Sequence, residues 1–239
     1  MSEKEQKFSL GNAQYSIVLI GNFIPLMFHP IWFGNNEVLP KEEVDFAQSR
    51  QANFPVIVTP QITMFKTSQF QVRIEENRFE VVSEKEPAVL LKDFISKTFE
   101  NLGSLTIRAF GLNYNAHYKI ASLKLYHKIG DRLAPKAYWI KLLEKEVEGD
   151  DRKSGLISLQ MRKVKDKEQG YIQIRVLPSE LFKPGLLLCC NDHNLMAEDK
   201  QSAEEAMSEV DFTFDSAFQR MKALNEDLLK EVTREDEKQ

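Results

Sequence analysis

The densest group of side chains that could do chemistry is a polar and aromatic cluster near the middle of the chain. It comprises Asn113, Tyr114, Asn115, His117 and Tyr118. A histidine can act as an acid or base near neutral pH, and amides and phenols can donate and accept hydrogen bonds. No carboxylate or nucleophile stands at a useful spacing from His117, so we predict a binding site and no catalytic residue. Alternatively, Tyr114 and His117 only hydrogen-bond a strand-to-helix junction together.

A second group of potential ligands is the run Cys189-Cys190-Asn191-Asp192-His193. Zinc needs four converging ligands, and adjacent strand residues point to opposite faces, so the two cysteines cannot share one ion. Cys190 could still join Asp192 or His193, but we favour buried strand cysteines followed by a polar turn. The chain also lacks phosphate-loop, nucleophile-elbow and paired-cysteine motifs. We therefore predict no metal, no cofactor and no enzymatic activity.

Basic residues suggest an alternative function, nucleic-acid binding through the run 119–136. The run contains Lys119, Lys124, Lys128, Arg132 and Lys136. A net charge of −4 and a pI of about 5.7 argue against a broad phosphate-binding surface, although a local patch can still bind. A second basic group lies around a predicted hairpin turn and consists of Arg162, Lys163, Lys165 and Lys167. Acidic residues alternate with these basic residues, so we interpret the segment as a solvated loop.

These residues must be positioned by strands and helices that the hydrophobic pattern predicts. Apolar and polar residues alternate over 70–82 and again over 156–177, which is typical of two antiparallel hairpins. Helical spacing predicts helices over 87–102 and 116–129. The sequence thus predicts an α+β fold with mostly antiparallel sheets, helices packed on one face, and two halves related by pseudo-symmetry. We expect a polar arm (1–13), two halves (14–148 and 149–232) and a charged tail (233–239).

The last long helix should begin near Asp215 or Ser216, after an extended segment over 210–214. Its apolar stripe could dock on the protein's own sheet or pair with a second copy, with Asn225 as one polar heptad position. We favour docking on the sheet. The stripe consists of Phe214, Phe218, Met221, Leu224, Leu228 and Val232.

Bulk properties point to a soluble protein. The 239 residues are 42% hydrophobic and 28% charged, which is ordinary for a globular protein. No apolar run approaches the roughly 20 residues that span a bilayer, and the charged segment Met1–Lys7 lacks the apolar core of a signal peptide. The two cysteines are adjacent, which fits a reducing compartment, so we expect a cytoplasmic protein.

The segment Gly111-Leu112-Asn113-Tyr114-Asn115 resembles the Gly-Leu-Arg-Tyr-Ile-Asn type motif of a sporadically distributed, uncharacterised family of bacterial proteins. The resemblance extends to a hairpin with an Arg-Phe return (here Asn77-Arg78-Phe79) and a Phe-rich C-terminal helix, and would cover about residues 15–232. Asn113 replaces the basic residue of the motif. The resemblance implies no activity, but patchy distribution would suit genes of defence islands.

Taken together, these patterns predict a non-enzymatic, cytoplasmic binding protein that acts in a protein complex, in a bacterial defence or stress module. Its partner would be another protein, or a second copy through the C-terminal helix. Nucleic-acid binding through 119–136 is the alternative, and no membrane interaction is expected.

Overall fold

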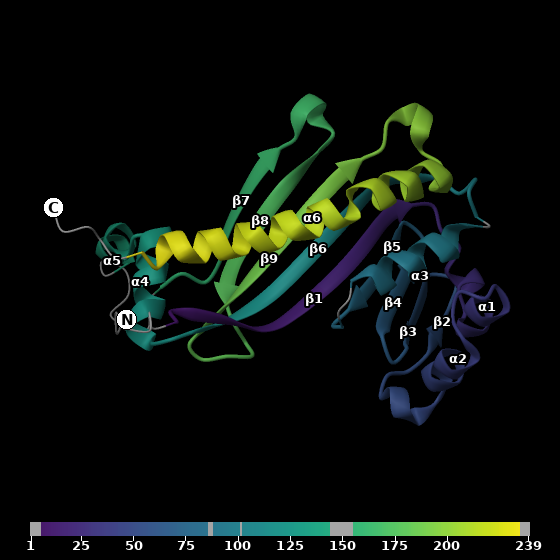
Figure 1. Ribbon diagram of the computed structural model, residues 1–239, viewed down its shortest axis with the longest axis horizontal. Helices are drawn as coiled ribbons and strands as arrows, with labels where there is room; N and C mark the ends of the chain where they lie inside the picture. The colour runs from purple at the N-terminus through teal and green to yellow at the C-terminus, as the bar shows by residue number, and fades with distance from the viewer. Residues whose placement is uncertain (1–5, 86–87, 101, 144–154, 235–239) are drawn as a thin grey trace, which may run out of the picture.

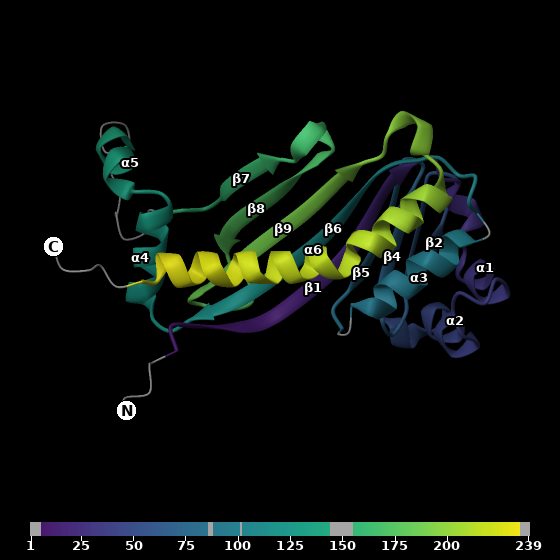
Figure 2. The ribbon, with the colours of Figure 1, turned by 45° about the horizontal axis from the view of Figure 1, so that its top comes forward.

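The computed structural model describes residues 6–85, 88–100, 102–143 and 155–234. Nine strands form one antiparallel sheet in the order β2-β3-β4-β5-β1-β6-β9-β8-β7 (Figure 1). Two helices, α3 and α6, contact each other and lie across the same face of this sheet (Figure 2). The predicted α+β fold, with antiparallel strands and helices on one face, is confirmed.

The strands are β1 (Phe8–Gly21), β2 (Ile57–Val58), β3 (Ile62–Lys66), β4 (Phe70–Glu75), β5 (Arg78–Ser83), β6 (Ile107–Ile120), β7 (Leu159–Val164), β8 (Gly170–Pro178) and β9 (Gly185–Leu195). The helices are α1 (Pro30–Asn35), α2 (Lys41–Gln48), α3 (Val89–Glu100), α4 (Leu123–Leu133), α5 (Lys136–Leu143) and α6 (Ala203–Val232). Among these described helices, none is both long and apolar enough to cross a bilayer.

The order of elements repeats along the chain. A long strand (β1 or β6) is followed by two helices, then by a meander whose last strand (β5 or β9) pairs back on the long strand, and then by a helix. The repeated units are therefore residues 8–100 and 107–232, and β1 pairs with β6 where they meet. The boundary predicted at 148/149 falls within 144–154, outside the described residues. Because β6 opens the second unit, the repeat divides near residue 100 instead.

The N-terminal arm is shorter than predicted. Strand β1 begins at Phe8 and pairs with the far end of β6, so residues 8–13 belong to the sheet. Within β1 the side chains alternate. Tyr15, Ile17 and Leu19 face the helices and are almost fully buried, whereas Ser16 and Val18 face the other side.

Strand β6 extends through a segment that we predicted to be helical. It runs to Ile120 and is paired along most of its length with β1 and β9, and α4 begins only at Leu123, after the N-cap Ser122. The prediction of a helix over 116–129 was therefore wrong for its first seven residues, of which 116–120 are strand. Long-range pairing with two neighbouring strands decides the conformation here, since local propensity is only a weak constraint.

Helix α6 begins earlier than predicted, at Ala203, where the Ser202 side chain accepts a hydrogen bond from the Glu205 N–H. The segment 210–214 is helical because Val210 and Phe214 continue a buried stripe at helical spacing. That stripe packs on the protein's own sheet, as predicted, but its members differ in part: Leu224 of the predicted stripe is 36% exposed, and Leu229 is buried. Asn225 is fully buried within it, and its Oδ1 accepts a hydrogen bond from Cys190 Sγ at 3.0 Å.

Candidate functional site: a polar pocket on the open face of the sheet

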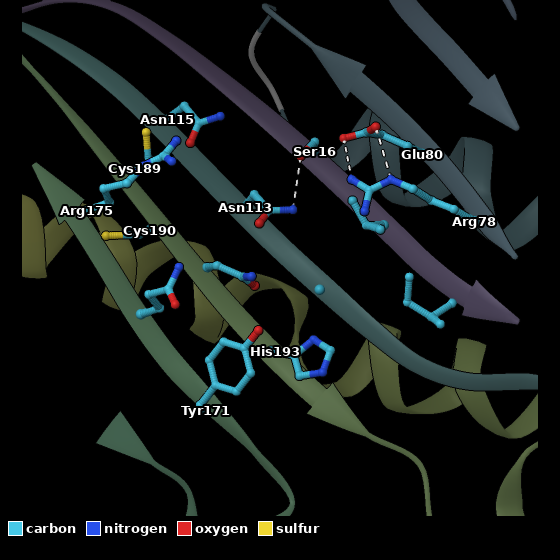
Figure 3. Close-up of a pocket in the computed structure, with 15 residues that line it drawn as sticks. Ser16, Arg78, Glu80, Asn113, Asn115, Tyr171, Arg175, Cys189, Cys190 and His193 are labelled. Atoms are coloured by element: carbon cyan, nitrogen blue, oxygen red, sulfur yellow. Dashed lines mark hydrogen bonds and ion pairs between the residues drawn. The ribbon is translucent and has the colours of Figure 1, made fainter. Parts of the chain in front are cut away.

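The sheet face opposite α3 and α6, here called the open face, carries a hollow of about 480 Å³. Strands β1, β5, β6, β8 and β9 contribute its lining, and α6 lies behind the sheet when the hollow is viewed from the front (Figure 3). We call this hollow the open-face pocket. Ligand sites in proteins commonly have volumes of roughly 300–1,000 Å³, so one small ligand would fit.

A row of polar side chains crosses the open face from strand to strand, and all of its members except Arg162 line the pocket. Its members lie directly opposite one another on β1, β6, β9, β8 and β7: Ser16, Asn113, Asn191, Gln173 and Arg162. Asn113 Nδ2 donates to Ser16 Oγ at 3.1 Å (Figure 3), and Arg162 Nη2 donates to Gln173 Oε1 at 3.1 Å. Asn191 stands in the middle of the row. Unlike the oxygens of Ser16 and Gln173, its Oδ1 is buried and has no hydrogen-bond partner among the described residues.

Three planar groups stack beside this row. The Tyr171 and His193 rings lie 4.7 Å apart at an interplanar angle of 28°, and Figure 3 shows them side by side. The Arg162 guanidinium carbon lies 4.0 Å from the centre of the Tyr171 ring, which is a cation–π contact. Burial, together with Lys165 and Arg162, lowers the pKa of His193, so its imidazole is neutral at pH 7.

Two guanidinium groups line the pocket at other points. Arg78 is held by Glu80 through an ion pair at 3.0 Å (Figure 3). Arg175 hydrogen-bonds Cys189, yet burial outweighs this contact and raises the pKa of the Cys189 thiol. Burial also raises the pKa of Cys190 to about 12. Both thiols are therefore protonated at neutral pH, and a protonated thiol is a poor nucleophile and a poor metal ligand.

The predicted binding cluster is divided between the two faces of β6. Asn113 and Asn115 line the open-face pocket. Tyr114 and Tyr118 point the other way and are buried under the helices, so they do not reach the pocket. His117 shares the face of Asn113, but its Nδ1 lies 2.9 Å from Ser179 Oγ, away from the pocket lining. The whole cluster lies within β6 and not at a strand-to-helix junction. Successive side chains of a strand point to opposite faces, and this alternation divides the cluster.

The candidate metal ligands are divided in the same way. Cys190 and Asp192 face the helices, while His193 faces the pocket. Asp192 is almost fully buried, and both Lys165 and Arg220 donate to its carboxylate. Within the described part of the chain, no group of three or more histidine, cysteine or acidic side chains is arranged to hold a metal ion. Lys165 is thus a structural residue and not part of a solvated loop.

Three of the five residues of the basic run make contacts within the protein. Lys119 lies over the Phe182 ring at 4.8 Å, and Arg132 Nη1 donates to the Val232 carbonyl oxygen, near the C-terminal end of α6, at 2.8 Å. Lys136 pairs with Asp131 at 3.5 Å. Lys124 and Lys128 stand four residues apart on α4 and therefore on one face of that helix.

Sequence reasoning missed most of the pocket. The alternation in Tyr-Ile-Gln-Ile-Arg-Val, residues 171–176, had already assigned Tyr171, Gln173 and Arg175 to the polar face of a hairpin. These three residues share a pocket with Asn113 because β9 lies between β8 and β6. No local sequence pattern predicts that strand order. No protein-family model and no curated protein sequence matches this chain.

Proposed function

We propose that this is a non-enzymatic binding protein that receives its ligand in the open-face pocket. The observation that carries the proposal is Asn191 Oδ1, a buried acceptor that lacks a partner among the described residues and belongs to the polar floor of the pocket. Leaving such a group unsatisfied costs about 1–3 kcal/mol. Because this oxygen is buried, the Asn191 side chain would have to turn toward the pocket to meet a ligand N–H or O–H. That contact would remove the cost, so the pocket is suited to a ligand with hydrogen-bond donors.

The chemistry of the pocket favours binding over catalysis. Its histidine is neutral, its cysteines are protonated, and its lining carboxylate Glu80 is held by Arg78. A general acid–base mechanism needs a titratable group poised near the operating pH and a second group that orients it. We further propose that the protein works in the cytoplasm within a protein complex, and the resemblance noted above suggests a bacterial defence or stress module.

Replacing Asn191 by leucine should abolish ligand capture without unfolding the protein. Leucine keeps the side-chain size and removes the unsatisfied acceptor, a change that is nearly neutral for stability or favourable. Immobilised wild-type protein would be incubated with an extract of its host cells. Bound small molecules and proteins would be released with denaturant and identified by mass spectrometry. We expect at least one species to be captured by wild type and lost from Asn191→Leu.

The matched control is Gln71→Ala, an exposed polar residue of β4 that lies outside the pocket lining. This variant should capture the same species as wild type. Identical capture by all three proteins, or capture by none of them, would contradict the proposal.

Nucleic-acid binding through α4 is a second candidate, favoured by the position of Lys124 and Lys128 on one face of that helix. Lys124→Glu combined with Lys128→Glu should abolish any salt-dependent binding to single- or double-stranded DNA, because phosphate contacts dominate such affinity. Arg132 is left intact because it holds the end of α6. Gel-shift titrations at two salt concentrations would measure the effect. Unchanged binding by the double variant would remove this surface as a candidate.

A further inference from the structure

The two edges of the sheet differ in how well they are closed to another chain. At one edge, β2 has only two residues, and Pro55 and Pro60 flank it. Short edge strands and prolines hinder pairing with a further strand. At the other edge, β7 has six residues and no proline, and five of them are exposed. Figures 1 and 2 show β7 as the outermost strand, and among the described residues it pairs only with β8.

The backbone of β7 directs hydrogen-bonding groups away from the sheet. The Lys165 N–H donates to the Gly170 carbonyl oxygen at 2.9 Å, and this pair closes the β7–β8 hairpin. Every second residue pair of an antiparallel ladder is hydrogen-bonded, so residues 159, 161 and 163 also bond to β8. The N–H and C=O groups of Gln160, Arg162 and Val164 therefore point outward. They form a template on which a further strand can pair.

The side chains of β7 give both faces of this edge the same combination of properties. Arg162 and Val164 lie on the open face, whereas Met161 and Lys163 lie on the face covered by the helices. Met161 is 61% exposed and Val164 is 57% exposed, because no described element covers them. Each face of the edge thus offers one apolar side chain and one cation. An added strand would find an apolar contact and a charge partner on each of its own faces.

The two cations decide which strand this edge accepts. Arg162 is exposed and is held beside the edge by the Tyr171 ring and by Gln173, and Lys163 is exposed as well. Two copies of β7 paired with each other would bring four such cations together, and like charges on neighbouring strands repel. A strand that carries glutamate or aspartate would be attracted instead. The same charges therefore disfavour a second copy and favour an acidic partner.

We infer that β7 is a docking edge for an extended acidic segment of another protein, which adds a strand to the sheet. Backbone hydrogen bonds provide affinity in this mode of recognition, and alternate side chains provide specificity. The segment carries, on each face, one acid for Arg162 or Lys163 and one apolar residue for Met161 or Val164. This inference rests on the proposed role in a protein complex and names its surface. It does not require a ligand in the open-face pocket.

Peptide display against the full-length protein tests the inference. The acidic library has peptides of ten residues in which glutamate and aspartate are mixed with valine, isoleucine, threonine and tyrosine. The best binder would be synthesised with a fluorescent label, together with a counterpart in which lysine replaces every acid. Fluorescence anisotropy should show at least tenfold tighter binding of the acidic peptide. Recovery of no acidic binder, or equal binding of the two peptides, would overturn the inference.

A proline on the edge tests whether the peptide pairs with the backbone of β7. Gln160→Pro removes an outward N–H but no bond of the β7–β8 ladder, and prolines are tolerated on edge strands. It should weaken binding of the acidic peptide at least tenfold. The matched control is Gln160→Ala, which loses the same side-chain hydrogen bond to Gln173 but keeps the backbone N–H, and should bind as wild type. Equal binding by both variants would show that no strand is added at β7.

Charge reversal tests the predicted specificity and does not depend on the proline variant. Lys163→Glu should weaken binding of the acidic peptide about tenfold. Lys66→Glu makes the same charge change at an exposed position of β3, near the opposite edge of the sheet, and should have no effect. Circular dichroism would verify that every variant is folded. An equal loss in both charge variants would reduce the effect to net charge and contradict a site at β7.

Further outcomes separate this inference from its rivals. Light scattering of the wild type should show a monomer; a dimer that Gln160→Pro converts to a monomer would mean that β7 pairs with a second copy, and the inference would be wrong. Asn191→Leu should bind the acidic peptide as wild type does. If no acidic peptide binds while capture from extract still depends on Asn191, the docking edge is wrong and the binding role of the pocket stands.

Discussion

Replacing Tyr114 by alanine should lower the free energy of unfolding by about 3–5 kcal/mol, the range found when large aromatic side chains are removed from protein cores. Tyr114 is 1% exposed and packs between the sheet and α6. Its ring centre lies 5.3 Å from that of Tyr15, which in turn lies 5.4 Å from that of Phe218 on α6. The truncation therefore leaves a cavity where the two repeated units and the long helix meet.

The neighbouring variant Asn113→Ala provides the matched control. Asn113 is on the open face, so its loss removes the hydrogen bond to Ser16 and should cost only about 0.5–1.5 kcal/mol. Urea unfolding of both variants, followed by circular dichroism, would give the two values. Asn113→Ala should instead impair ligand capture. Equal destabilisation by the two substitutions would contradict the alternation of burial along β6.

The second large effect concerns the ion pairs of Asp192. Substituting both Lys165→Met and Arg220→Met should destabilise the protein by about 3–5 kcal/mol, because a buried carboxylate is then left without a cation. Asp192 is 2% exposed at its side chain, and its two cations come from the β7–β8 hairpin and from α6. The ion pairs thus tie an edge of the sheet to the helix layer.

Asp192→Asn should be less damaging, at about 2 kcal/mol, because the two cations are 24% and 46% exposed and can turn toward water. Lys230→Met breaks exposed pairs with Glu226 and Asp227 on the same helix and should leave the unfolding midpoint unchanged. Urea titrations at pH 7 would compare all three variants. A deficit no larger than that of Lys230→Met would show that the ion pairs contribute no net stability.

The elements with strong local patterns were predictable. The hairpins over 70–82 and 156–177 follow from alternation with a period of two residues, and α3 follows from helical spacing. Docking of α6 followed from its apolar stripe. Errors occurred where the local signal was ambiguous: residues 116–120 are strand because β1 and β9 pair with them, and residues 210–214 are helix because they continue the stripe of α6.

The sequence by itself determined which side chains share a face of each strand. Alternation alone separates Asn113 from Tyr114 and Cys190 from His193, since neighbouring residues of an extended chain point in opposite directions. Only the tertiary structure decided which strands are neighbours, because strand order depends on hydrogen bonds between segments far apart in the chain. That order brings Gly111, Asn191 and Tyr171 into one pocket, and it leaves Asn191 Oδ1 without a partner among the described residues.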